Sequence, residues 1–253
     1  MIWEVCAVGS IIAVLSGKGG TGKTSVCAGV AIALAEAGAT VLCIDCDVGL
    51  RNLDISLGMS DNGTLSFLDV LRGGYPLEQA PRHSSYPSLA FLTAPVNVSA
   101  DEIDVDAFTR LLYTARSRFD YILLDAPAGL DTGFRLAAVP ADRCILVTGA
   151  APAAVRDAAR VGDVLEIMGK KDVRLVVNRV DKAIFTSMKL TVDDIMDTAG
   201  LPLLGIVPED HNVVLAAAFG EPLLKYKKRS PAAVSYRNIS KRIQGMPVPI
   251  TLR

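Results

Sequence analysis

Aromatic residues and long apolar runs are both scarce in this sequence. Phe, Trp and Tyr make up 6% of its 253 residues, which argues against the aromatic-rich core of a β-sandwich. No stretch approaches the roughly 20 apolar residues that a membrane-spanning helix needs. Five cysteines, an odd number in a chain of this length, argue against a disulfide framework. We therefore expect free thiols and a cytoplasmic location.

The N-terminus lacks the charge pattern of a secretory signal. Residues 1–15 are mostly apolar, but no Lys or Arg precedes the apolar run and the stretch contains Glu4. Hydrophobic residues make up 51% of the chain and charged residues 21%, a balance too apolar for a disordered protein. We interpret residues 1–253 as a single domain, with residues 1–10 as a short leader and residues 246–253 as a flexible tail.

Basic residues are concentrated at the C-terminal end. Eight of them, and no Asp or Glu, lie from Lys225 to Arg253, so the net charge of −1 for the whole chain leaves −9 on residues 1–224. The cluster from Lys225 to Arg229 could attract anionic lipid or DNA, but a run of charges more often forms a solvated face. We do not expect nucleic-acid binding.

Continuous apolar runs alternate with helical segments along the chain. Strands without polar alternation are buried on both faces, which is typical of a parallel sheet between helices. The sequence therefore predicts an α/β fold with a doubly wound, mainly parallel sheet flanked by helices. The predicted strands are Ile11–Ser16, Val41–Asp45, Tyr121–Asp125, Cys144–Val147, Val173–Asn178 and Leu203–Val207. The predicted helices between them include Thr24–Ala37, Val105–Arg116 and Ala153–Met168.

A further helix is predicted near the C-terminus. Ser230 and Pro231 suit an N-cap and a first helical residue, and Gly245 suits the helix end. The apolar stripe that should pack on the domain consists of Ala232, Tyr236, Ile239 and Ile243. We expect the basic side chains of this helix to face outward, namely Arg237, Lys241 and Arg242.

A phosphate-binding loop is the strongest motif. Residues Gly17–Thr24 read GKGGTGKT, in which two glycines bracket four residues before a Lys and a hydroxyl residue. Between a buried strand and a helix, backbone N–H groups can surround phosphate oxygens at the helix N-terminus. Lys23 adds positive charge there, and the Thr24 hydroxyl can bind Mg²⁺. The predicted nucleotide-binding residues of the loop are Gly17, Gly19, Gly20, Thr21, Gly22, Lys23, Thr24 and Ser25.

Three aspartates lie at or just beyond the ends of predicted strands. Asp45 and Asp125 end their strands at the edge where open parallel sheets bind ligands. We expect these two carboxylates to hold Mg²⁺ and its waters. Asp47 lies two residues beyond Asp45, where it could reach a water molecule over the terminal phosphate.

Lys18 makes the loop unusual, because a Lys directly after the first glycine is the signature of the deviant Walker A ATPases. Further matching segments are CIDCDVGLRNLD (residues 43–54), LLDAPAGLDTGF (123–134), AVRDAAR (154–160) and GIVPEDHNVVLAAAFGEPL (205–223). Together they resemble the MinD family of septum site-determining ATPases, from about Ile11 to Ile243. The GLRNLD and PAG elements fit this family better than the plasmid-partition ParA proteins.

The resemblance implies a switch that depends on ATP and Mg²⁺. Two subunits would sandwich two ATP molecules, with Lys18 reaching the partner's phosphates, so hydrolysis would be slow and would require the homodimer. The partners would be division inhibitors or topological-specificity proteins of the Min type, at the cytoplasmic face of the cell membrane. The implied catalytic residues are Lys18, Lys23 and Asp47. The implied metal-binding residues are Thr24, Asp45 and Asp125. The implied base-binding residues are Asn178, Pro208, Glu209 and Asp210.

Two features depart from the family pattern. Ala151 replaces the carboxylate that helps to read the nucleotide across the dimer. In the family a C-terminal amphipathic helix inserts into the membrane, whereas only residues 246–253 follow Gly245 here, and Pro247 and Pro249 break helical turns. Either the chain is truncated or it uses another partner, and we therefore do not expect membrane association through this end.

Other functions remain open on the same fold. A ParA-type partitioning ATPase would use the basic end on DNA or cargo, and a metabolic enzyme would transfer phosphate to a small acceptor. Residues Asn178–Asp181 read NRVD, close to the NKxD with which GTPases read guanine. The Arg in place of Lys, together with the deviant loop, favours ATP over GTP.

Two further patterns have ordinary structural explanations. Cys43 and Cys46 have the CxxC spacing of redox and metal sites, but no second pair completes a ligand set and a strand directs residues three apart to opposite sides. His83 and His211 have no ligand partners nearby in the sequence. We therefore expect core packing for the cysteines and loop or cap roles for the histidines.

Overall fold

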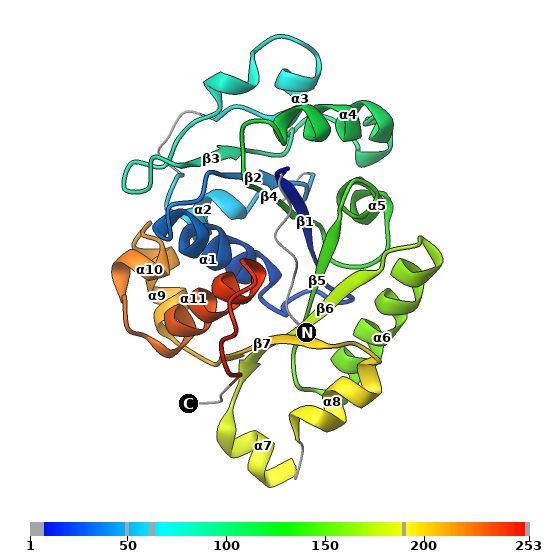
Figure 1. The fold of residues 1–253 in the computed structure, drawn as a ribbon, viewed down its shortest axis with the longest axis vertical. Coiled ribbons are helices and arrows are strands. Elements are labelled where there is room, and N and C mark those ends of the chain that lie inside the picture. The colour runs from blue at the N-terminus through cyan, green and yellow to red at the C-terminus, as the bar shows by residue number, and fades with distance from the viewer. Residues whose placement is uncertain (1–7, 49–50, 61–63, 189–190, 251–253) are drawn as a thin grey trace.

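The computed structural model describes residues 8–48, 51–60, 64–188 and 191–250. Within these ranges the centre is a seven-stranded sheet whose strands are all parallel, in the order β3-β2-β4-β1-β5-β6-β7 (Figure 1). The strands are apolar along their length because both faces of the sheet are covered. Their bounds are β1 Ser10–Leu15, β2 Val41–Asp45, β3 Leu89–Leu92, β4 Tyr121–Asp125, β5 Arg143–Thr148, β6 Asp172–Val180 and β7 Leu203–Pro208.

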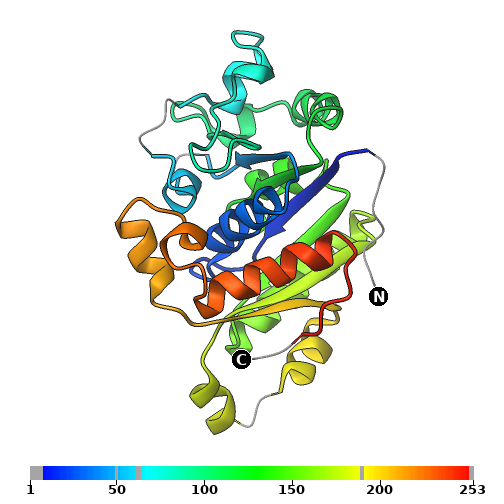
Figure 2. The same ribbon diagram turned by 60° about the vertical axis from the view of Figure 1, so that its left-hand side comes forward.

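Helices cover both faces of the sheet (Figures 1 and 2). One face carries α1, α2, α9, α10 and α11, and the other carries α3, α4, α5, α6 and α8. The bounds of the first group are α1 Lys23–Glu36, α2 Leu53–Leu57, α9 Asn212–Ala218, α10 Leu223–Tyr226 and α11 Pro231–Ile243. Those of the remaining helices are α3 Phe67–Leu71, α4 Val105–Ala115, α5 Thr132–Ala138, α6 Pro152–Ile167, α7 Lys182–Met188 and α8 Val192–Ala199.

Alternation along each strand divides the apolar side chains between two cores. In β1, Ile11 and Ala13 face the core beneath α4, α5 and α6, whereas Ile12 and Val14 face the core beneath α1 and α11. All four side chains are fully buried. Burial on both sides fixes the register of the sheet, because a slip of one residue would exchange the two sets.

The six predicted strands are confirmed, with ends within two residues of those expected. The sequence reading missed β3, which pairs with β2 at the edge of the sheet. The predicted C-terminal helix is also confirmed as α11, with the Ser230 side chain accepting a hydrogen bond from the backbone of Ala233 and the ring of Tyr236 buried.

The orientation expected for two basic side chains of α11 is wrong. Arg237 forms an ion pair with Glu36 on α1. Arg242 is half-buried and donates hydrogen bonds to the carbonyl oxygens of Leu204 and Val248. These contacts form because a neighbouring carboxylate and backbone carbonyl groups lie within reach of the long side chains. Lys241 is exposed as expected.

β1 occupies the point where the order of the sheet reverses. The chain places β2, β3 and β4 on one side of β1 and β5, β6 and β7 on the other. Open parallel sheets bind ligands beyond the carboxyl ends of the strands at such a point. The glycine-rich loop leaves β1 at this position. Among the described residues, no helix has the length and apolarity that crossing a membrane requires.

Candidate nucleotide-binding site

The glycine-rich loop turns sharply before α1 begins at Lys23. Gly20 and Gly22 have φ angles of 80° and 79°, which glycine adopts without strain. At Gly22 a side chain is excluded for a second reason, because a Cβ atom would lie 2.3 Å from the amide nitrogen of Asn178. The turn leaves the first backbone N–H groups of α1 without partners inside the helix, available to an anion.

Lys23 and Asp125 form a buried ion pair at the centre of the site. Nζ of Lys23 lies 2.6 Å from Oδ1 of Asp125, and the side chains are 8% and 2% exposed. Burial lowers the pKa of Lys23, but the charge of Asp125, its hydrogen bond with Lys23 and the weaker effects of Cys27 and Asp47 together outweigh burial and leave the pKa raised. Burial raises the pKa of Asp125, against the opposing effects of Lys23 and of a hydrogen bond from Thr24. The pair keeps a charged ammonium group beside the loop.

Asp45 anchors the segment that follows β2. One carboxylate oxygen accepts a hydrogen bond from the backbone of Asp47 at 2.9 Å, and the other accepts from Asn52 and Leu53 at 3.2 Å. Burial, and then the charge of Asp125, raise the pKa of Asp45 to about 7. Burial also raises the pKa of Asp47. The sequence reading did not anticipate that Asp45 would hold backbone groups in addition to serving a metal.

The oxygen donors of the site fit a magnesium ion. Thr24 supplies a hydroxyl group, and the two carboxylates come from paired positions of neighbouring strands, Asp45 on β2 and Asp125 on β4. Mg²⁺ prefers oxygen ligands and usually keeps several waters, bound through one or two carboxylates and substrate phosphates. No group of three or more His, Cys, Asp or Glu that could hold a metal occurs in the described ranges. The donor set therefore suits an ion that arrives with a nucleotide.

A cavity of about 140 Å³ lies beside the loop at the ends of β6 and β7. Asn178, Pro208, Glu209 and Asp210, the residues expected to contact the base, all line it. Asn178 is 3% exposed, and its amide nitrogen donates a hydrogen bond to the carbonyl oxygen of Thr21 at 2.7 Å. The structure thus brings the expected base-binding residues together and shows that Asn178 also contacts the loop.

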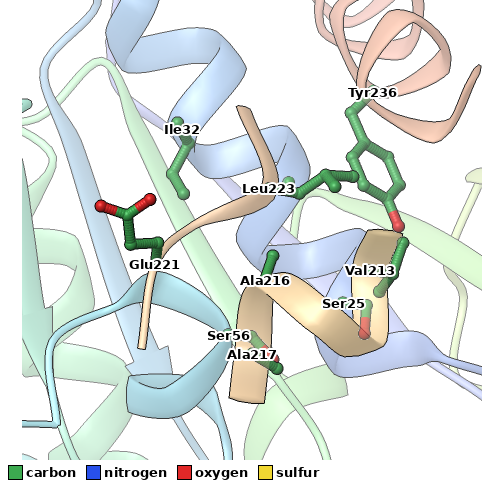
Figure 3. Close-up of a pocket in the computed structure, with 10 residues that line it drawn as sticks. Ser25, Ile32, Ser56, Val213, Ala216, Ala217, Glu221, Leu223 and Tyr236 are labelled. Carbon is green, nitrogen blue, oxygen red and sulfur yellow. The ribbon is translucent and has the colours of Figure 1, made fainter. Parts of the chain in front are cut away.

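A second cavity, of about 30 Å³, lies between α1, α9 and α11 (Figure 3). Val213 and the ring of Tyr236 project toward Ser25 there. This volume is enough for about one water molecule, so the cavity is too small for a nucleotide. Ser25, expected to bind nucleotide, lines both this cavity and the 140 Å³ cavity beside the loop.

Lys18 has surroundings unlike those of Lys23. Its side chain is exposed, and none of the ion pairs formed within the described part of the chain includes it. Ala151 is also exposed, directly before α6, and gives that helix no side-chain cap. One ammonium group of the loop is therefore buried beside Asp125, and the other belongs to an exposed side chain.

Arg179 is a site residue that the sequence reading did not assign. Its φ of 58° is unusual for a residue other than glycine. Nε and Nη2 bind the carboxylate of Glu209 at 2.8 and 3.3 Å, and Nη1 donates to the carbonyl oxygen of Gly20 at 3.3 Å. The NRVD segment drew attention to this position only as a variant of a guanine-reading motif.

The remaining cysteine and histidine predictions are confirmed. Cys43 and Cys46 are fully buried thiols that face opposite cores. His83 is buried in a loop, with Nε2 2.9 Å from the carbonyl oxygen of Leu57. His211 stands at the N-cap position of α9 without a side-chain capping bond.

Comparison with known proteins places the chain in a family. The model of the CobQ/CobB/MinD/ParA nucleotide binding domain matches residues 12–223. The septum site-determining protein MinD of Synechocystis sp. is 38% identical over 241 residues, which cover 94% of this chain and 91% of the relative. A putative septum site-determining protein MinD of Guillardia theta is 38% identical over 240 residues, with 94% and 89% of the two chains covered.

Solved structures agree with the sequence relatives. A chain of the MinC:MinD cell division protein complex of Aquifex aeolicus has a TM-score of 0.89 and 35% identity, covering 96% of this chain and 99% of its own. The septum site-determining protein MinD from Pyrococcus horikoshii, complexed with Mg-ADP, has a TM-score of 0.82 and 30% identity, with 93% and 96% covered. The chain therefore belongs to the CobQ/CobB/MinD/ParA family and, within it, is a P-loop ATPase of the septum site-determining MinD type.

Proposed function

We propose that the chain is a Mg²⁺-dependent switch that forms an ATP-sandwich homodimer and positions the septum-site machinery by recruiting regulator proteins. The observation that carries the proposal is the contrast between two lysines of one loop. Lys23 is buried against Asp125, whereas Lys18 is exposed. This contrast supports a role for Lys18 at the phosphates of a second subunit and not at those of its own. Dimerisation would then depend on bound ATP.

Binding would begin with an exchange of partners at Lys23. Phosphate oxygens would take its ammonium group from Asp125, and the freed carboxylate would hold the metal or its waters together with Thr24 and Asp45. Bound Mg²⁺ neutralises charge on the phosphate oxygens. The Mg-ADP in the Pyrococcus horikoshii relative supports this choice of ligands. The adenine would occupy the cavity lined by Asn178 and residues 208–210.

Hydrolysis would depend on the second subunit. Phosphoryl transfer requires alignment and charge neutralisation more than covalent chemistry by the protein. Asp47, held beside the site by its hydrogen bond to Asp45, would orient the attacking water. Lys18 from the partner would complete the positive charge around the phosphates. Turnover would therefore be slow and would require the dimer.

The dimer would present a surface that neither monomer has. The MinC:MinD complex of Aquifex aeolicus supports partners of the Min type for this chain. We propose division inhibitors or topological-specificity proteins as those partners, at the cytoplasmic face of the membrane. The same ATP-dependent assembly would then control when they bind.

Size-exclusion chromatography with light scattering tests the dimer. In ATP and Mg²⁺, Asp47→Ala should be dimeric because it binds without hydrolysing, and Lys18→Ala should be monomeric because it cannot reach the partner. Lys171→Ala, which changes an exposed lysine directly before β6, should behave like the unmodified chain. The proposal would be contradicted if calorimetry shows that Asp47→Ala binds ATP and the variant nevertheless stays monomeric.

A further inference from the structure

Two residues at the end of β6 hold the phosphate loop by its carbonyl groups. Asn178 donates to the oxygen of Thr21 at 2.7 Å, and Arg179 donates to the oxygen of Gly20 at 3.3 Å. Hydrogen bonds to the carbonyl oxygens restrict rotation of the peptide units, which also carry the N–H groups that would bind phosphate. The end of β6 therefore influences the shape of the loop before any ligand arrives.

Arg179 also bonds to the wall of the base cavity. Its Nε and Nη2 atoms bind the two carboxylate oxygens of Glu209 at 2.8 and 3.3 Å, the geometry of a bidentate pair. The backbone of Glu209 is fixed in turn, because its N–H donates to the carbonyl oxygen of Val180 at 3.0 Å. One guanidinium group thus connects the base cavity with the phosphate loop.

Stability alone does not explain this arrangement. The φ of 58° at Arg179 lies in the left-handed region, which is strained for most residues that have a side chain. The side chains of Arg179 and Glu209 are 57% and 45% exposed, and exposed ion pairs contribute little to stability. A strained backbone that supports a weakly stabilising pair indicates a functional role for the pair.

We propose that Arg179 is a positioning residue that couples the base cavity to the phosphate loop through Glu209. Glu209 orients the guanidinium group, and the guanidinium group holds the carbonyl of Gly20. Glu209 therefore contributes to phosphate affinity although it lies on the base side of the site. This inference rests on the proposed nucleotide function and extends it to a regulation of the loop by its neighbouring cavity.

Calorimetry with Mg-pyrophosphate, a ligand that has phosphates and no base, tests the coupling. Glu209→Gln and Arg179→Lys each break the bidentate pair. Both should weaken Mg-pyrophosphate binding about tenfold. The double variant should be no weaker than either single variant, because the two residues act through the same contacts. Thermal unfolding without ligand should be unchanged, which separates positioning from loss of structure.

Mg-ADP and a matched ion pair provide the controls. Arg118 and Glu78 form a pair with similar exposure, 51% and 49%, and do not line the base cavity. Glu78→Gln should leave the affinity for both ligands unchanged. If Glu209→Gln weakens Mg-ADP binding but not Mg-pyrophosphate binding, Glu209 is only a base contact and the proposal is wrong.

The unmodified chain distinguishes this proposal from the one on which it rests. Binding of Mg-ADP without measurable binding of Mg-pyrophosphate would overturn the coupling, because the loop would then not be held in its phosphate-binding shape when no base is bound. Binding of neither ligand would overturn the proposed nucleotide function itself. Binding of both, with the losses described for the two variants, would support the coupling.

Discussion

The imidazole of His83 is buried, and both of its nitrogens are hydrogen-bonded to backbone groups. Nδ1 accepts from the backbone N–H groups of Ser85 and Tyr86 at 3.0 and 3.2 Å. Nε2 therefore carries the proton and donates to the carbonyl oxygen of Leu57 at 2.9 Å. Burial lowers the pKa of His83. Protonation of Nδ1 would break two backbone contacts, so an acid-sensitive contact is built into this loop.

Acid should weaken the fold through this residue. The pKa of His83 is lowered in the folded chain, so its contribution is present above the unfolded pKa of about 6.5 and is lost as the pH falls below it. The loss is at most about 1.4 kcal/mol per pH unit for one proton. Urea unfolding gives the free energy of unfolding at each pH from about 8 to about 5. This free energy should change less steeply with pH for His83→Gln than for the unmodified chain. His211→Gln changes an exposed histidine and should keep the pH dependence of the unmodified chain. An unchanged pH dependence in His83→Gln would show that His83 is not the cause of the acid sensitivity.

At the scale of residues, the phosphate loop is predictable because its spacing is local. Lys23 and Thr24 follow a run of glycines, and the neighbouring strand and helix place them. Contacts between distant side chains are less accessible to sequence reasoning. The partners of Arg179 are set only in the folded chain, where Glu209 and the carbonyl oxygen of Gly20 lie within reach. The residue types of the site could be inferred, but this pairing could not.

Among the helices, α1 and α11 pack closely against each other at Gly29. A Cβ atom there would lie 2.1 Å from a ring carbon of Tyr236, which is 1% exposed. The ring occupies space that any larger residue at position 29 would need. Glycine is helix-destabilising in itself, so its presence here reflects the packing of the two helices.

A single added methyl group should have different effects on the free energy of unfolding at two helical glycines, Gly29 and Gly162. Gly29→Ala should lower the free energy of unfolding by about 1–3 kcal/mol through overpacking. Gly162→Ala on α6 is the control, because its Cβ would lie 3.4 Å from Leu201, an ordinary contact, and Ala is the better helix former by about 1 kcal/mol. Urea unfolding of both variants measures the difference. Equal destabilisation would argue against close packing as the cause.

At the scale of elements, longer strands and helices could be predicted from the sequence, whereas two short elements could not. The predicted strands, which are five to nine residues long in the structure, and the capped helix α11 could be predicted because each carries a sustained pattern. β3 covers four residues, Leu89–Leu92, and α10 covers four, Leu223–Tyr226, too few to show a period. Their conformation depends on partners elsewhere, β2 for the strand and α9 for the helix. The outward orientation expected for Arg237 failed for the same reason, since Glu36 belongs to another helix.

Across the whole molecule, the candidate site joins segments from both halves of the sheet. Its residues follow β1, β2 and β4 on one side and β6 and β7 on the other. A ligand that binds only when all these ends are assembled must stabilise the complete fold. Nucleotide should therefore act on global unfolding and not on one loop alone.

Thermal unfolding with Mg-ADP tests this linkage. At a ligand concentration about 100 times Kd, the free energy of unfolding should rise by about 2.7 kcal/mol. Lys23→Ala should lose this increase because the buried cation is removed. Lys18→Ala should retain it, since Lys18 is proposed to serve the partner's phosphates and not its own. Loss of the ADP effect in Lys18→Ala would place both lysines on one site and would contradict the exchange between subunits.

The position of α11 has a consequence for synthesis on the ribosome. α11 follows every other described element, yet it covers α1. Its backbone N–H at Ala232 donates at 3.1 Å to Asp210, which lines the cavity beside the phosphate loop. A nascent chain that has extruded the phosphate loop but not Tyr236 leaves apolar side chains of α1 open to water and to chaperones. Ligand affinity should consequently arise late in translation, once residue 243 has cleared the exit tunnel.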